Sequence, residues 1–149
     1  MNIVNEINLS FMSKSINEWF ARSAICSFIL PLDPTVEELS DIKTAVSEAV
    51  TNCIVHGYKQ KSGTVYINAK ITDKNKVIIK IRDKGCGIED IEKAMQPMFT
   101  TAGDERAGLG FAVMQSFTDK IKVSSKPGKG TTVTLEKTIR SCVNYEREK

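Results

Sequence analysis

The stretch TVEELSDIKTAVSEAVTNCIVHG, residues 35–57, decides how the rest of the chain has to fold. Its apolar residues recur at the spacing of a helix that buries one side. They are Leu39, Ile42, Ala45, Val46, Ala49, Val50, Cys53 and Ile54. Thr35 and Glu38 have the spacing of a capping box, and Gly57 is suited to a helix end. The sequence therefore predicts a core helix that must pack against another apolar layer.

After this helix the apolar period changes from 3.6 to 2. Residues 65–71 and 77–82 alternate around the turn DKNK, which predicts an antiparallel hairpin, and KIKVSS and TTVTLE predict a second one around KPGKG. The other predicted elements are an edge strand and three helices, at residues 3–9, 13–29, 88–95 and 109–117. The longest of these helices is predicted from residues near helical spacing, which are Ile16, Trp19, Phe20, Ser23, Ile25 and Phe28. We expect an α/β (α+β) two-layer sandwich, with a mixed, mostly antiparallel sheet and helices on one face.

The bulk composition is that of an ordinary globular domain. The 149 residues are 41% hydrophobic and 26% charged, which predicts a single domain over residues 1–149. A net charge of +3 with scattered lysines gives no nucleic-acid footprint. No apolar run is long enough to cross a membrane, and no signal sequence is recognised, so we expect a cytoplasmic protein. The cysteines form no CxxC pair, and we expect free thiols rather than zinc ligands at Cys26, Cys53, Cys86 and Cys142.

Two groups of residues could carry chemistry. On the core helix, Glu48 and Asn52 lie one turn apart on the same flank, although such pairs also decorate ordinary half-exposed helices. In IRDKGCGI, Asp83 ends a strand that is predicted to be central, and Gly85 and Gly87 follow it. A carboxylate there can accept hydrogen bonds from the amino group of a base, and glycines let the backbone approach a flat ligand. A plain strand-ending turn is the alternative.

A third group lies in AGLGF, where Gly108 and Gly110 are predicted to open a helix. They follow residues 96–107, which have no clean period and are interpreted as a mobile loop. The N–H groups at the start of a helix favour a phosphate, although a glycine hinge before a core helix explains the pattern as well. The P-loop motif GxxxxGK[ST] and the motif GxGxxG are both absent from the sequence.

Taken in order, ExxxN, DxGxG, GLG and Thr131 in GKGTT resemble the N, G1, G2 and G3 boxes of the GHKL ATPase/kinase superfamily. The resemblance covers about residues 35–136. Within this superfamily the chain is most similar to the serine kinases that act as anti-sigma factors, in LDPTVEELSDIKTAVSEAVTNCIVHGY and in QPMFTTAGDERAGLGFAVMQSFTD. The resemblance implies the ATP-binding fold of that superfamily, called the Bergerat fold.

The resemblance also implies roles for residues around the phosphates. Asn52 would bind Mg²⁺, and Glu48 would be the general base for the attacking serine hydroxyl. Residues 96–107 would form an ATP lid, in which Arg106 meets the γ-phosphate. The expected cofactors are therefore ATP or ADP with Mg²⁺.

At the other end of the nucleotide, the resemblance implies that Asp83 binds the adenine amino group and that Thr131 supports this contact. Further nucleotide contacts are expected from Gly85, Gly87, Thr100, Thr101, Gly108, Leu109 and Gly110. Two positions depart from the family pattern: Cys86 replaces an aliphatic residue and Ala107 replaces a serine. His56 is expected to be structural or to lie near the nucleotide.

The resemblance also implies partners. These are the sporulation sigma factor F, an anti-sigma factor antagonist that is phosphorylated on serine, and a second copy of the chain in a homodimer. Arg22 in FARSA resembles a partner-contacting arginine, and the tail at about residues 140–149 is expected to be flexible. Two alternatives stay open: a nucleotide-gated binding module without phosphotransfer, and an anti-sigma kinase of the general stress response.

Overall fold

The computed structural model describes residues 2–95 and 105–140, and for residues 105–109 it describes the backbone alone. In chain order the elements are β1 (Ile3–Met12), α1 (Ser15–Ile29), the short 3-10 turn η1 (Leu30–Leu32), α2 (Val36–Asn52), the π-helical turn η2 (Cys53–Gly57), β2 (Thr64–Thr72), β3 (Lys76–Asp83), α3 (Ile91–Met95), α4 (Glu105–Phe117), β4 (Lys120–Lys126) and β5 (Gly130–Thr138).

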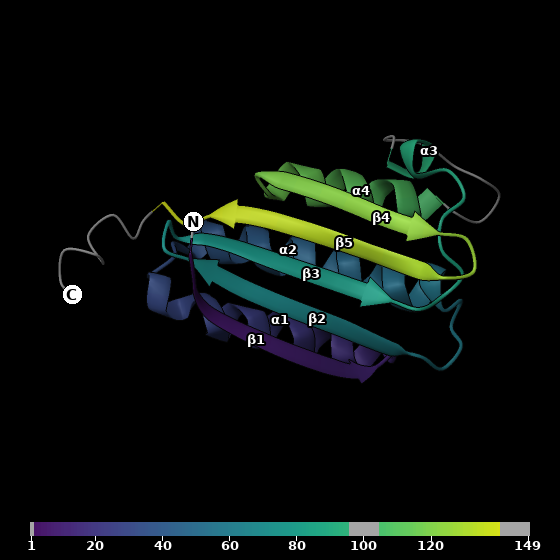
Figure 1. Ribbon diagram of the computed structural model, residues 1–149, viewed down its shortest axis with the longest axis horizontal. Helices are drawn as coiled ribbons and strands as arrows, with labels where there is room; N and C mark the ends of the chain where they lie inside the picture. Colours follow the sequence, from purple (N-terminus) through teal and green to yellow (C-terminus); the bar gives the residue numbers. More distant parts are fainter. Residues whose placement is uncertain (1, 96–104, 141–149) are drawn as a thin grey trace.

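The strands form one sheet in the order β1-β2-β3-β5-β4, and helices α1, α2 and α4 lie along one face of it (Figure 1). The predicted two-layer sandwich is confirmed. All four strand pairings in the described part are antiparallel, so no parallel pair of the expected mixed sheet is found there. Both predicted hairpins are present, as β2–β3 and β4–β5, and β3 is the central strand.

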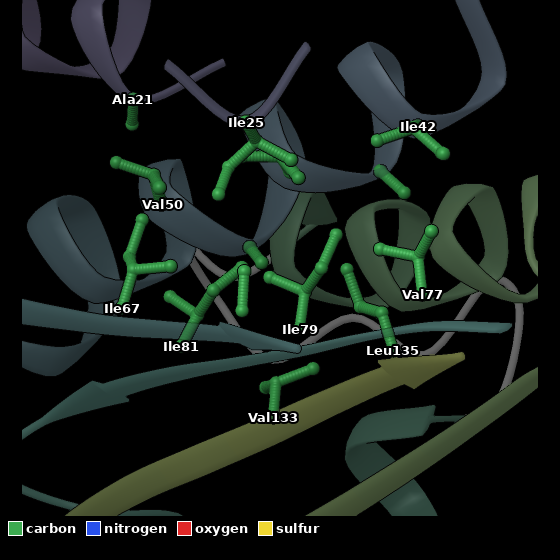
Figure 2. Packing of buried hydrophobic residues seen from close by; sticks show 14 of the residues in the cluster. Ala21, Ile25, Ile42, Val50, Ile67, Val77, Ile79, Ile81, Val133 and Leu135 are labelled. Carbon is green, nitrogen blue, oxygen red and sulfur yellow. The ribbon is translucent and has the colours of Figure 1, made fainter. Parts of the chain in front are cut away.

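The core lies between α2 and the inward-facing positions of the sheet. Alternate residues of the central strands are buried, among them Ile79 and Ile81 on β3 and Val133 on β5, and Figure 2 shows them pointing toward Ile42 and Val50 of α2. The helix is therefore fixed by packing along its whole apolar stripe. Any polar group on its flank is held at a defined place over the sheet.

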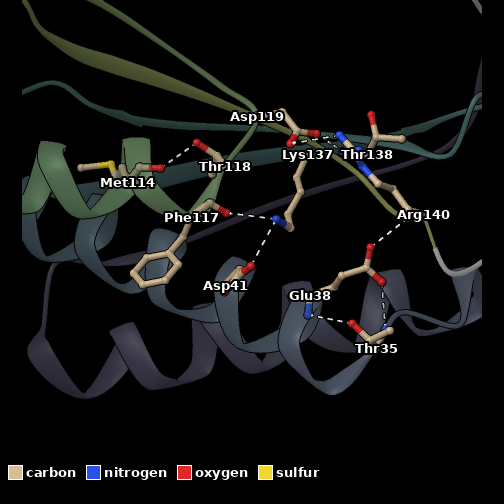
Figure 3. A network of polar contacts seen from close by, with 10 residues as sticks. All are labelled: Thr35, Glu38, Asp41, Met114, Phe117, Thr118, Asp119, Lys137, Thr138 and Arg140. Carbon is tan, nitrogen blue, oxygen red and sulfur yellow. Dashed lines mark hydrogen bonds and ion pairs between the residues drawn. The ribbon is translucent and has the colours of Figure 1, made fainter.

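The N-terminal end of α2 is fixed by polar contacts as well. Thr35 and Glu38 form the predicted capping box, with Glu38 N donating to Thr35 Oγ1 at 3.0 Å and Thr35 N donating to Glu38 Oε1 at 2.9 Å. The second carboxylate oxygen of Glu38 accepts from Arg140 N at 2.8 Å, and Asp41 pairs with Lys137 at 3.3 Å (Figure 3). These contacts tie the start of α2 to the end of β5.

Replacing Thr35 by alanine is expected to lower the free energy of unfolding by about 1 kcal/mol, the usual value of an N-cap. The loss arises because Glu38 N would have no side-chain acceptor. Urea unfolding followed by circular dichroism measures it. Ser40→Ala is the matched control, because Ser40 is exposed inside the same helix and should change stability little. An equal loss in both variants would contradict the capping role.

Helix α1 differs from the prediction. Of the residues at helical spacing, Ile25 is buried as a core position, but Ile16, Trp19 and Phe20 are 75%, 64% and 53% exposed. The other buried positions of the helix are Ala21 and Ile29. The helix packs on α2 with a narrow face whose residues are four apart. Its wider apolar flank lies at the surface, with Phe20 meeting Phe11 of the edge strand β1 at a ring-centroid distance of 6.4 Å.

Candidate nucleotide site

The apolar core ends in a row of polar side chains at one end of the sheet. Along β3 the inward positions run Ile79, Ile81 and then Asp83, and Asp83 faces Thr131 of β5, which in turn faces Ser125 of β4. In an antiparallel sheet, directly opposed residues point to the same face. The three polar side chains therefore lie on the helix side of the sheet, where the next row is Ile81, Val133 and Val123. Burying polar side chains in this way costs free energy unless they are hydrogen-bonded.

Asp83 is 4% exposed and its carboxyl group is held by several donors. Gly85 N donates to Asp83 Oδ1 at 2.8 Å, and the Cys53 thiol and the Thr131 backbone N–H also donate to the carboxyl group. Burial raises the pKa of Asp83, and these three hydrogen bonds oppose the increase. Burial also raises the pKa of the Cys53 thiol well above its usual range, which keeps this thiol in its donor form. The carboxyl group is therefore fixed in orientation.

The end of α2 meets Asp83 through the π-helical turn η2. Tyr58 N donates to Cys53 O at 2.9 Å, which widens the last turn of the helix. A Cβ atom at Gly57 would lie 2.7 Å from Asp83 Cγ, and one at Gly85 would lie 2.1 Å from Gly57 O. Gly57 does end the helix as predicted, but the reason is this close approach and not a left-handed cap. Cys86 N also donates to Gly57 O at 2.9 Å.

One turn earlier on α2, Glu48 and Asn52 lie over the first part of α4. A Cβ atom at Gly110 would be 3.2 Å from Glu48 Oε2 and 3.2 Å from Asn52 Oδ1. Both amide atoms of Asn52 are buried, and neither has a hydrogen-bond partner among the residues that the structure describes. Buried polar atoms without partners are rare in folded proteins and ask for a ligand or water. The structure thus brings Glu48, Asn52 and Gly110 together.

Helix α4 begins earlier than the sequence predicts. Gly108 and Gly110 were expected to open it, but the helix starts at Glu105, so both glycines lie within its first two turns. Residues 105–107 contain no large apolar side chain that would show a helical period, so the pattern groups them with the preceding loop. Thr100 and Thr101 lie outside the described residues, as does most of the predicted lid. For Arg106 and Leu109 only the backbone is described, so their predicted contacts stay predictions.

Three further predicted positions lie as follows. Gly87 has a φ of +75°, and a Cβ atom there would be 2.1 Å from Lys126 O, so both its conformation and its surroundings require glycine. Arg22 pairs with Glu18 at 3.3 Å on α1, and Figure 1 shows α2 lying between α1 and α4. Arg22 is thus apart from Glu48, Asn52 and Asp83. His56 lies in η2, close to the G1 glycines, because its carbonyl oxygen accepts from Cys86 Sγ at 3.2 Å.

Sequence reasoning missed Ser125 and Cys53 as members of the site. Ser125 Oγ lies 2.8 Å from Thr131 Oγ1, and it joins the β4–β5 hairpin to the G1 loop by accepting from Ile88 N at 2.8 Å. The sequence does contain a signal for Ser125. The inward positions of β4 are apolar at Ile121 and Val123, and the next inward position is this serine. Cys53 was counted as part of the apolar stripe, and in the structure it is both core and donor to Asp83.

The residues present fit a magnesium ion held jointly with phosphates. Mg²⁺ usually takes one or two protein oxygens and fills its other positions with phosphate and water. The partnerless Asn52 Oδ1 offers one such oxygen. In the described part of the chain, no group of three or more His, Cys, Asp or Glu side chains forms a complete metal cage. A magnesium ion at Asn52 would therefore need phosphate or water to fill its other positions.

The family described as Histidine kinase-like ATPase domain matches residues 21–137, which begin within α1, include every element from α2 to β4, and end within β5. The chain belongs to this family. Among its relatives, a protein of Thermoanaerobacter sp. (strain X514) named anti-sigma F factor is 58% identical over 142 residues, covering 95% of this chain and 99% of the relative. Proteins of the same name from Clostridium acetobutylicum and Halalkalibacterium halodurans are 54% and 53% identical and cover 93% and 92% of their own lengths.

Two solved structures share the fold. The RsbU and RsbW domains of a Mycobacterium tuberculosis protein match with a TM-score of 0.68 at 17% identity, over 91% of this chain and 32% of that one. A blue-light activated histidine kinase domain from Erythrobacter litoralis EL346 matches with a TM-score of 0.55 at 20% identity, over 86% of this chain and 64% of the other. At these identities the likeness concerns the fold alone.

Proposed function

We propose that this chain binds ATP with Mg²⁺, transfers the γ-phosphoryl group to a serine of an anti-sigma factor antagonist, and binds and inhibits sigma factor F. The observation that carries the proposal is the arrangement of Glu48 and Asn52 over Gly110, with both Asn52 amide atoms buried and without partners in the described part of the chain. The names of the relatives supply the partner class.

In the proposed mechanism, one end of the site binds the base of the nucleotide and the other end carries out phosphoryl transfer. Asp83 and Thr131 would hold the base of the nucleotide. Asn52 would hold Mg²⁺, which would supply positive charge beside the phosphates. Glu48 accepts the proton of the substrate serine hydroxyl as that oxygen attacks the γ-phosphorus, and ADP leaves with the bridging oxygen. Because Glu48 and Asn52 are one helical turn apart on a helix fixed by the core, the base and the metal ligand keep their spacing.

Further contacts to the phosphates belong to the same proposal. Arg106 would offset charge at the γ-phosphate, and the residues 96–107 would close over the nucleotide as a lid. The remaining proposed nucleotide contacts are Gly85, Gly87, Thr100, Thr101, Gly108, Leu109 and Gly110.

The protein partners would meet the chain at α1 and β1. Ile16, Trp19 and Phe20 form an exposed apolar patch beside β1, whose outer edge is unpaired within the described sheet. Such a patch with an open edge strand favours association, so we assign this side to a homodimer and propose that Arg22 on α1 contacts the sigma factor. We further propose that residues 1–149 act as one domain in the cytoplasm. Within the described residues, no helix is long and apolar enough to span a membrane.

Two other functions would use the same residues. A nucleotide-gated binding module would hold its partner without phosphotransfer, and Glu48 beside the Asn52 amide favours the kinase over it. A general-stress anti-sigma kinase would differ only in its sigma factor, and the names of the relatives favour sigma factor F.

The test combines a phosphate-transfer assay with affinity capture of the sigma factor. Purified chain is incubated with ATP labelled on the γ-phosphate, Mg²⁺ and candidate antagonist proteins, and label on an antagonist serine is measured. Affinity capture from sporulating cells then identifies the bound sigma factor. ATP binding without transfer to any antagonist would support the binding module, and capture of another sigma factor would contradict the sigma factor F assignment.

A further inference from the structure

The hydroxyl group of Ser125 makes three short polar contacts at the base end of the site. It accepts from Ile88 N at 2.8 Å, lies 2.9 Å from the carbonyl oxygen of Gly130, and lies 2.8 Å from Thr131 Oγ1. Ser125 and Thr131 are directly opposed on β4 and β5, as are Thr131 and Asp83 on β5 and β3. One row of the sheet thus joins Ser125 to the buried carboxyl group.

The protons of this network can be assigned by counting. A serine hydroxyl has one proton and two lone pairs. Ile88 N–H takes one lone pair, and the Gly130 carbonyl can only accept, so the Ser125 proton points to it. Without a proton, two oxygens 2.9 Å apart would repel. The second lone pair of Ser125 is therefore left for the Thr131 hydroxyl, which must be the donor in their contact.

This assignment fixes what Thr131 can offer a ligand. Its single proton is committed to Ser125, so its oxygen presents only lone pairs. Its neighbour Asp83, when ionised, is also an acceptor only, and the Thr131 backbone N–H is already donated to that carboxyl group. Asp83 and Thr131 can therefore only accept hydrogen bonds from a ligand. This favours a ligand edge, or a bridging water, that donates hydrogen bonds. The two side chains disfavour an edge that presents a carbonyl oxygen, because its lone pairs would have no donor.

We propose that Ser125 is a positioning residue that makes the site select a purine with an amino group at position 6 over one with an oxo group. It acts by holding Thr131 as an acceptor. The inference rests on the nucleotide function proposed above and assigns base selectivity to a residue that does not itself meet the base. In a Ser125→Ala variant the Thr131 hydroxyl is free to rotate and can donate to a 6-oxo group.

The experiment compares ATP with inosine triphosphate, which carries an oxo group in place of the 6-amino group. Affinities of the full chain for both are measured by calorimetry. We expect the wild type to prefer ATP, and Ser125→Ala to reduce the ratio of the two affinities by about fivefold to tenfold, the scale of one hydrogen bond. Ser125→Thr keeps the hydroxyl and should keep the ratio. Ser124→Ala is the matched control, because Ser124 lies on the opposite face of the same strand.

A double-mutant cycle separates this role from a structural one, because Ser125 also holds Ile88 N. In a Thr131→Val background, Ser125→Ala should no longer change the ratio. An equal change in that background would mean that Ser125 acts through the G1 loop, and it would overturn the inference. So would an unchanged ratio in a folded Ser125→Ala variant. Failure of the wild type to bind ATP would instead overturn the proposed function, and with it this inference.

Discussion

Replacing Glu48 by alanine is expected to slow phosphate transfer to the antagonist by roughly 10²–10⁴-fold, the usual contribution of a general base. ATP affinity should stay nearly unchanged, because the base end of the site, at Asp83 and Thr131, lies on other elements. Glu48 Oε2 and Asn52 Oδ1 lie equally close to Gly110, so the carboxylate is positioned beside the proposed metal ligand. Single-turnover kinetics with labelled ATP, together with calorimetry, measure the two quantities separately.

Two further variants give this prediction its control. Glu37→Ala removes an exposed carboxylate from the first turn of the same helix and should leave the transfer rate unchanged. Glu48→Gln keeps the shape of the side chain without its basicity and should be as slow as the alanine variant. Transfer at the wild-type rate in Glu48→Gln would remove Glu48 from the chemistry. A large loss of ATP affinity in that variant would make it a binding residue instead.

The parts of the fold that could be predicted are those in which local pattern and packing agree. The capping box at Thr35 begins α2 where expected. In β2 and β3, the alternation of apolar and polar residues in the sequence matches the alternation of buried and more exposed residues in the sheet. Asp83 could be singled out because a carboxylate follows two buried positions on a strand predicted to be central. Each of these signals is contained within a few consecutive residues.

What could not be predicted depends on contacts between distant segments. Position 57 requires glycine because the Asp83 side chain lies against it, and position 85 because it lies against the Gly57 backbone; no local pattern encodes either contact. The role of Ser125 arises from a row across three strands, and the serine has no special neighbour in sequence. For helix α1, apolar residues at helical spacing do not indicate which of them face the core: Ile25 is buried, whereas Trp19 is 64% exposed.

Replacing Asp83 by asparagine is expected to weaken ATP binding by about 1.5–3 kcal/mol, or roughly 10–150-fold, the scale of a lost hydrogen bond to a charged group. Gly85 N–H and Thr131 N–H both need an acceptor at position 83, so the asparagine oxygen would turn toward them. Its NH₂ group would then face the amino group of the base. Because both groups are hydrogen-bond donors, no hydrogen bond could form between them. Calorimetric titration with ATP measures the effect.

The same substitution should have an unusual effect on stability. Because burial raises the pKa of Asp83 in the folded state, the folded chain takes up this proton at a higher pH than the unfolded chain. Protonation therefore favours folding, and lowering the pH from neutrality toward the ordinary range of aspartate should raise wild-type stability relative to Asp83→Asn, which does not titrate. Thermal unfolding of both proteins across that range checks the sign. A relative loss for the wild type would mean that the carboxylate is stabilised in the fold and not strained by burial. Asp90→Asn, at an exposed carboxylate near Gly85 and Gly87, should leave ATP affinity unchanged.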